Sequence, residues 1–199
     1  MRLRTVGILA VLAAVCGLGS GVARAVSVTY NTSGVFSSTS GSTITSGGVT
    51  IVFTGANFTV NADTNSNLGT FAITGVTPFN GNFSDSFKLT VTQSVPTPGG
   101  SMAFGTGTLS GIITVNSSQA YIDFAEPLTI QIGSLPPVTY SIIISDTLNP
   151  GRVTLNPPGQ DTTVQGRITA VPVPAAAWMG LSTLAGLAGM GLVRRRRSA

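Results

Sequence analysis

Few residues in this 199-residue chain could carry out chemistry, and their spacing is unfavourable. Asp123 and Glu126 form the only close pair of carboxylates. Paired carboxylates can hydrolyse a glycosidic bond when they face each other across about 5–10 Å. Side chains three positions apart on a strand point to opposite faces, so this pair is misdirected unless a bulge intervenes. The chain has no histidine, which excludes Ser/His and Cys/His catalysis and histidine-based zinc sites, and we predict no catalytic residue and no cofactor.

One segment resembles a metal-binding loop. Asp63, Asn65 and Asn67 have the spacing of the first oxygen ligands of a calcium loop. Leu68 stands where an EF-hand needs glycine, and Thr74 stands where it needs glutamate. A polar turn between strands is therefore the better interpretation, and calcium bound by an irregular loop remains the alternative.

The charge distribution limits the partners of the chain. The formal net charge is +4, but the arginines gather at the two ends. Between residues 26 and 170, three basic side chains (Lys88, Arg152 and Arg167) stand against six acidic ones, a net charge of −3. Nucleic-acid binding requires a basic face that neutralises phosphates, so we expect no nucleic-acid partner. The single cysteine, Cys16, lies in the N-terminal apolar run, so the mature protein is expected to hold no disulfide.

The elements that must position any site are predicted to be strands. At 87–92, 128–132, 138–144 and 163–168, apolar residues recur at every second position with mostly polar residues between them, which is the pattern of half-buried strands. Tyr121 and Tyr140 occupy strand positions that suit a core. Five sequences are typical of turns: Ser46-Gly47-Gly48, Asn80-Gly81-Asn82, Thr97-Pro98-Gly99-Gly100, Asn149-Pro150-Gly151 and Pro157-Pro158-Gly159. Residues 26–170 are therefore predicted to form one all-β ectodomain, an antiparallel β-sandwich or a jelly roll.

Residues 1–25 are typical of a secretory signal peptide. Arg2 and Arg4 precede an apolar segment, and Ala23 and Ala25 form an A-x-A site for signal peptidase. We expect cleavage after Ala25. A retained membrane helix is the alternative, and the short apolar segment argues against it.

The C-terminal residues 171–199 are predicted to contain a membrane anchor. Residues 175–193 carry no charge and, at about 1.5 Å per residue, are long enough to cross a hydrocarbon core of about 30 Å as a helix. Trp178 lies near the outer end of this segment, where an indole ring at the membrane–water interface is favoured. The stop-transfer signal is an arginine cluster: Arg194, Arg195, Arg196 and Arg197. A soluble C-terminal helix is the alternative, but the segment has no polar face at a helical period.

The segment before this helix carries a family resemblance. Val171, Pro172, Val173, Pro174 and Ala175, followed by the apolar span and the arginines, resemble PEP-CTERM sorting signals, most closely the VPLPA-CTERM subtype. The departure is Val173, where the subtype usually has leucine. The resemblance implies processing by an exosortase-type membrane enzyme, a Gram-negative type of host, and association with exopolysaccharide or extracellular matrix. The two prolines would keep these residues extended and accessible, and a helix-terminating pair without a recognition role is the alternative.

A second resemblance concerns the ectodomain. Asn67-Leu68-Gly69-Thr70-Phe71 and Phe87-Lys88-Leu89-Thr90-Val91 are similar to segments of the "choice-of-anchor" β domains that often precede such tails.

These observations predict an exported, non-enzymatic cell-surface or extracellular-matrix protein. It would be anchored in the inner membrane with its ectodomain outside the cytoplasm, and would reach the surface or matrix after processing. The alternative is a surface adhesin module that binds carbohydrate or calcium. Exposed aromatic side chains or clustered carboxylates on one edge would favour the adhesin, and a surface of serine and threonine alone would favour the structural role.

Overall fold

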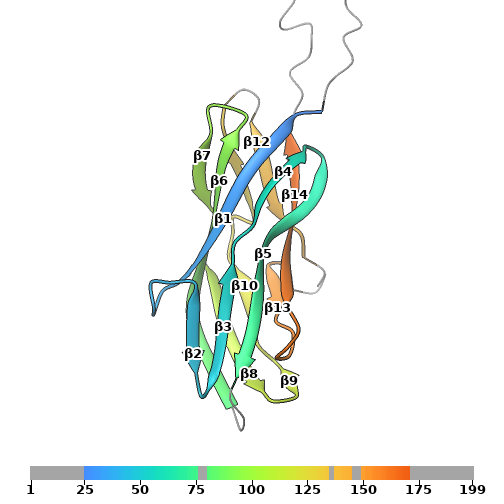
Figure 1. Cartoon of the computed structure of the whole chain (residues 1–199). Coiled ribbons are helices and arrows are strands. Elements are labelled where there is room, and N and C mark those ends of the chain that lie inside the picture. The colour runs from blue at the N-terminus through green and yellow to red at the C-terminus, as the bar shows by residue number, and fades with distance from the viewer. Residues whose placement is uncertain (1–24, 76–79, 135–136, 145–148, 171–199) are drawn as a thin grey trace, which may run out of the picture. The chain divides into compact units, whose positions relative to one another are not determined.

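The computed structural model describes residues 25–75, 80–134, 137–144 and 149–170. Within these residues the regular structure consists of strands arranged in two curled antiparallel sheets (Figure 1). The all-β prediction is therefore confirmed. A hydrophobic core lies between the two sheets and takes side chains from both.

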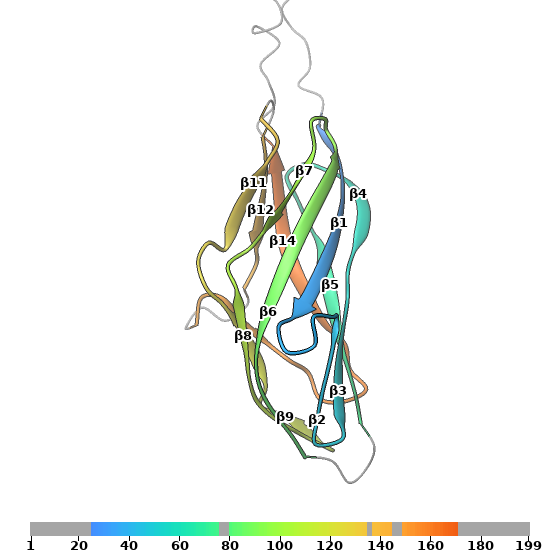
Figure 2. The same cartoon turned by 90° about the vertical axis from the view of Figure 1, so that its left-hand side faces the viewer.

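The larger sheet is built around a long central strand, β6. Its strand order is β13 (Arg152–Thr154), β10 (Tyr121–Phe124), β8 (Gly107–Thr114), β6 (Asn80–Val95), β1 (Ser27–Phe36) and β4 (Asn57–Asn61). Two short strands extend it: β7 (Gly100–Ala103) pairs with β6, and β9 (Ser117–Ser118) pairs with β8. Figure 2 shows β1 and β6 running side by side, as their antiparallel register requires.

The smaller sheet has the order β11 (Thr129–Ile132), β12 (Val138–Ile142), β14 (Thr162–Ala170), β5 (Thr64–Gly75), β3 (Val49–Thr54) and β2 (Thr43–Ser46). The turn predicted at Ser46-Gly47-Gly48 joins β2 to β3 and is confirmed. The prediction of a turn at Asn80-Gly81-Asn82 is wrong. These residues begin β6 and pair with Ile112, Ile113 and Thr114 of β8, so pairing across the sheet overrides their turn-forming tendency.

The chain changes sheets between β3 and β4. Thr32 fixes this crossing: its backbone N–H donates to Ala56 O at 2.8 Å, and its hydroxyl accepts a 2.7 Å hydrogen bond from Ala56 N. The same hydroxyl donates to Leu68 O on β5 at 2.8 Å. One buried hydroxyl therefore holds β1, the crossing and β5 together. After the crossing, β4 pairs with β1 in the other sheet.

The predicted alternation locates the core correctly. Phe87, Leu89 and Val91 are fully buried on β6, while Lys88 between them is exposed. An aromatic cluster forms the centre, with Phe71 4.9 Å from Phe53 and 5.1 Å from Phe87 between ring centroids. Gly34 faces this cluster without a side chain, because a Cβ there would overlap Phe53 and Phe87. The core is closely packed at this point.

Two buried tyrosines link the sheets. The phenol of Tyr30 on β1 lies 2.7 Å from Ser66 Oγ and 2.8 Å from Asn67 O on β5. Tyr140 on β12 donates a hydrogen bond to Gln93 Oε1 on β6. Burial raises the pKa of Tyr30, with a smaller opposing effect from its hydrogen bond to Ser66. Burial, and then the neighbouring Tyr30, raise the pKa of Tyr140. Both phenols therefore stay protonated, as hydrogen bonding in a core requires.

The outer faces of the sheets carry several pairs of hydroxyl groups. Serine and threonine side chains hydrogen-bond across neighbouring strands at 2.7–3.0 Å, in the pairs Thr29–Thr59, Thr45–Thr50, Thr92–Ser101, Thr114–Ser117 and Thr129–Ser141. Such cross-strand pairs stabilise a sheet modestly and without charge.

The two ends of this β unit meet at one corner. Ala62 N donates to Val26 O at 2.8 Å, and the next residue, Asp63, donates from its N–H to Ile168 O at 2.7 Å. The corner between β4 and β5 therefore ties the start of β1 to the end of β14. Figure 1 shows both of these strand ends at the same end of the unit.

Candidate functional site

A cleft lies between β13 and the first half of β14. Among the described strands, β13 pairs with β10 alone, so its other edge is open. β12 pairs with β14 only from Gly166 to Ala170. One further hydrogen bond joins Ile143 N to Gln165 O. β13 and β14 converge where Asn156 N donates to Thr162 Oγ1 at 2.7 Å. The two strands therefore form a cleft that is closed at the Asn156 end.

The cleft is polar and has a volume of about 420 Å³. Its described lining combines amides and hydroxyls with a few aliphatic side chains: Ile143, Ile144, Arg152, Val153, Thr154, Asn156, Thr162, Thr163 and Gln165. No carboxylate belongs to this described lining. Amide and hydroxyl groups beside the guanidinium of Arg152 suit a ligand rich in hydroxyl groups.

Arg152 at this cleft contacts a carboxylate and an aromatic ring. It is the one cation among the described residues that stacks on a ring. It lies opposite Asp123 in the register of β13 and β10. Arg152 Nε donates to Asp123 Oδ1 at 2.7 Å, and a terminal nitrogen donates to Oδ2 at 2.8 Å. The guanidinium also lies over the Tyr121 ring, 3.8 Å from its centroid. The bidentate geometry holds Arg152 in a fixed orientation at the cleft.

The prediction that Tyr121 belongs to the core is wrong. Ile122 and Phe124 are the buried residues of β10, and Tyr121 and Asp123 alternate with them on the outer face. Tyr140 is in the core as predicted, and Tyr30, for which no core position was predicted, is also buried there. Burial of Ile122 and Phe124 directs Tyr121 to the outer face of β10, where the Arg152 guanidinium stacks on its ring.

The two carboxylates of the candidate pair have separate partners. Asp123 is engaged by Arg152, whereas Glu126 lies beyond the end of β10 and accepts a hydrogen bond from Leu128 N at 3.0 Å. Among the described residues, no group of three or more acidic, cysteine or histidine side chains is arranged to hold a metal ion.

The candidate calcium ligands are divided between a turn and a strand. Asp63 occupies the corner with a φ of 65°, while Asn65 and Asn67 lie on β5 opposite Arg167 and Gln165. Asn67 Oδ1 already accepts a 2.6 Å hydrogen bond from Gly69 N. The polar turn is thus limited to the residues before β5, and we assign no cation to these side chains.

The targeting segments fall mostly outside the described residues. These include Ala23, the sorting motif Val171–Ala175, the span 175–193 and the cluster Arg194–Arg197, whereas Ala25 is described and exposed. In the part of the chain that the structure describes, no helix has the length and hydropathy needed to cross a membrane.

No protein-family model, curated protein or solved structure matched the chain.

Proposed function

We propose that this chain is an exported, non-enzymatic protein of the cell surface or extracellular matrix, delivered by a signal peptide and an exosortase-type sorting tail. Its two sheets would form a sandwich or jelly-roll ectodomain that the tail first holds at the inner membrane. Signal peptidase and an exosortase-type enzyme would process the chain, and the mature protein would associate with exopolysaccharide.

The observation that carries this proposal is the position of the domain ends. β1 begins at Ser27, the second residue after the expected signal cleavage, and β14 ends at Ala170, directly before the sorting motif. Hydrogen bonds from Ala62 and Asp63 hold both ends at one corner. A domain attached in this way can lose the signal peptide without a change in its core. The sorting tail can likewise hold it at the membrane or release it.

The surface of the unit supports the structural role. Its outer faces carry uncharged hydroxyl pairs, and the one ion pair between described side chains joins Arg152 to Asp123. The interactions of such a surface should change little with ionic strength, because it contains few charges that salt can screen.

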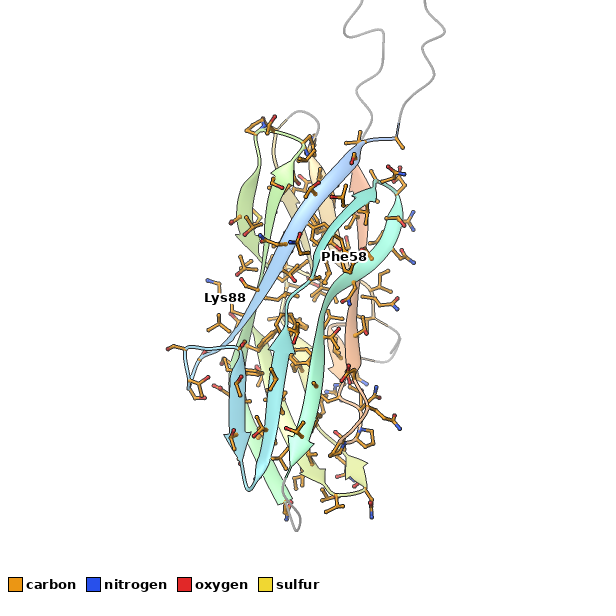
Figure 3. The ribbon with its side chains drawn as sticks, viewed as in Figure 1. Phe58 and Lys88 are labelled. Atoms are coloured by element: carbon orange, nitrogen blue, oxygen red, sulfur yellow. The ribbon has the colours of Figure 1, made fainter. Side chains whose placement is uncertain are left out.

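Lys88 offers a direct test, since it is the only lysine of the chain and is exposed on β6 (Figure 3). Intact host cells would be treated with an amine-reactive reagent that does not cross membranes, and the Lys88 peptide would be examined by mass spectrometry. The proposal predicts modification of Lys88 on intact cells and its loss in Lys88→Arg. Modification only after lysis would contradict surface exposure.

Carbohydrate binding is the second candidate, and the polar cleft between β13 and β14 favours it. Gln165 lines this cleft, whereas Gln131 is an exposed glutamine on β11 outside it. Co-sedimentation with purified host exopolysaccharide should then be weakened by Gln165→Ala and unchanged by Gln131→Ala. Equal behaviour of the two variants would rule out this cleft as the binding site.

A further inference from the structure

Strand β4 leaves one backbone edge unpaired at the end of the larger sheet. Among the described strands it pairs with β1 alone. Thr32 N donates to Ala56 O, and Ala62 N donates to Val26 O. In an antiparallel pair, every second residue of a strand hydrogen-bonds to the same neighbour. Even-numbered residues of β4 therefore bond to β1. Asn57, Thr59 and Asn61 point their N–H and C=O groups away from it.

Within the described residues, this edge lacks the features that normally prevent pairing between molecules. Natural sheets protect their edges with charges, prolines, bulges or a covering segment. β4 has the sequence NFTVN and a continuous register with β1, and four of its five residues are exposed. By contrast, the edge strand β2 is tied to β6 where Ser46 Oγ donates to Asn82 O at 2.7 Å, and the edge strand β13 carries the charged Arg152. β4 is thus an open edge with no charge.

The side chains of β4 are complementary to a second copy of themselves. Phe58, labelled in Figure 3, is 44% exposed. It lies on the same face as the buried Tyr30, with which it is paired. We propose that β4 pairs antiparallel with β4 of a second copy of this chain, centred on Thr59. Phe58 then lies opposite Val60 of the second copy, and Asn57 opposite its Asn61. Apolar side chains meet apolar ones and amides meet amides, without any pair of like charges.

The pairing also fixes how the two copies point. Asn61 lies opposite Ser27, at the end of the unit where β1 starts and β14 ends. Antiparallel pairing places this end of each copy beside the far end of β4 in the other. This orientation has a consequence if the proposed sorting tail holds that end at a membrane. Copies on facing surfaces, or copies released into the matrix, can then pair. Two copies on one membrane could pair only with their strands parallel to the membrane plane.

A disulfide between engineered cysteines tests this register. In full-length protein carrying Cys16→Ala, Thr59→Cys places the two new thiols on the twofold axis, where paired Cα atoms lie about 5.5 Å apart and a disulfide can form. Asn57→Cys is the matched control, because its copies lie about 14 Å apart along the strands. We expect a disulfide dimer for Thr59→Cys, none for Asn57→Cys alone, and a mixed dimer when Asn57→Cys and Asn61→Cys are combined. Equal cross-linking of the two single variants would overturn the register.

A second measurement tests the association without cysteines. The full chain, purified in detergent, would be sized by light scattering at increasing concentrations. Thr59→Lys places two ammonium groups across the axis and should weaken dimerisation by about tenfold or more, whereas Thr108→Lys, on an exposed position of β8, should not. A monomeric unmodified chain, or equal effects of both lysines, would overturn the proposal. Labelling of Lys88 on intact cells is independent of this result, so failure of pairing and failure of surface location are distinguishable.

Discussion

The phenol of Tyr140 on β12 donates a hydrogen bond of 3.0 Å to Gln93 Oε1 on β6, which joins the two sheets through the core. The other end of the same amide donates from Nε2 to Pro96 O at 3.0 Å. No buried side-chain nitrogen or oxygen of the described residues lacks a hydrogen-bond partner. Removal of one partner therefore leaves the other unsatisfied inside the protein.

Tyr140→Phe should destabilise the fold for this reason. Gln93 Oε1 loses its donor, and the expected decrease in the free energy of unfolding is about 1–3 kcal/mol. Urea denaturation measures it. Tyr121→Phe is the matched control, because Tyr121 lies on the outer face, and a change below about 0.5 kcal/mol is expected there. Equal effects of the two changes would show that the bond between the sheets contributes nothing to stability.

Alkaline pH should destabilise the protein through the two buried tyrosines. Their pKa values are raised in the folded state, so the unfolded chain loses these protons first as the pH rises. Stability from this source is complete below the unfolded pKa of about 10 and decreases above it. The melting temperature should therefore fall above this pH, and fall less steeply in Tyr140→Phe. The same alkaline decline in both proteins would assign the effect to other groups.

Gly34→Ala should be destabilising because the aromatic cluster occupies the space of the new methyl group. Its Cβ would overlap Phe53 and Phe87, and overpacking of a core typically costs about 1–3 kcal/mol. Gly41→Ala is the control, since the nearest atom to its Cβ, Thr39 O, lies 3.8 Å away. Thermal unfolding should separate the two variants. A Gly34→Ala protein as stable as Gly41→Ala would contradict the packing described here.

Residues 26–170 expressed alone should form a stable β protein. The far-UV spectrum should be that of strands, and the thermal transition should be cooperative and unaffected by reductant, because Cys16 lies outside this segment. A helical spectrum would contradict the two-sheet fold. A transition that shifts with reductant would contradict the absence of a disulfide.

Sequence patterns predicted the buried faces more successfully than the neighbours of each strand. Alternation in Phe87–Val91 identified the buried side chains, because the period of two reports which face of a strand is covered. It does not report which strand lies alongside. The Arg152–Asp123 pair joins residues 29 positions apart, and no local pattern marks it.

The same limit explains the features that sequence reasoning missed. The cleft exists because β12 stops before it reaches the first half of β14, and the open edge of β4 exists because the chain changes sheets at Ala56. Both depend on strand order. The turn predicted at Asn80-Gly81-Asn82 failed for a related reason, since β8 supplies the partners that keep these residues extended.

Processing of the tail is the central prediction of the proposed function, and Pro172 and Pro174 can be changed to test it. Replacement of both by alanine should let the helix extend outward and leave unprocessed protein in the membrane. Replacement of Arg194–Arg197 by serine should instead impair stop-transfer and orientation while the recognition segment stays intact. Identical behaviour of the two variants would argue against a separate recognition role for the prolines.

The most direct measurement is the mass of the mature protein recovered from the surface of a host that carries an exosortase. We expect an N-terminus at Val26 and a new C-terminus near residues 170–177, without the hydrophobic tail. A protein that begins at Met1 would contradict export by a cleaved signal peptide. Surface-exposed protein that still contains peptides from Trp178 to Arg197 would show that the tail is only a transmembrane anchor.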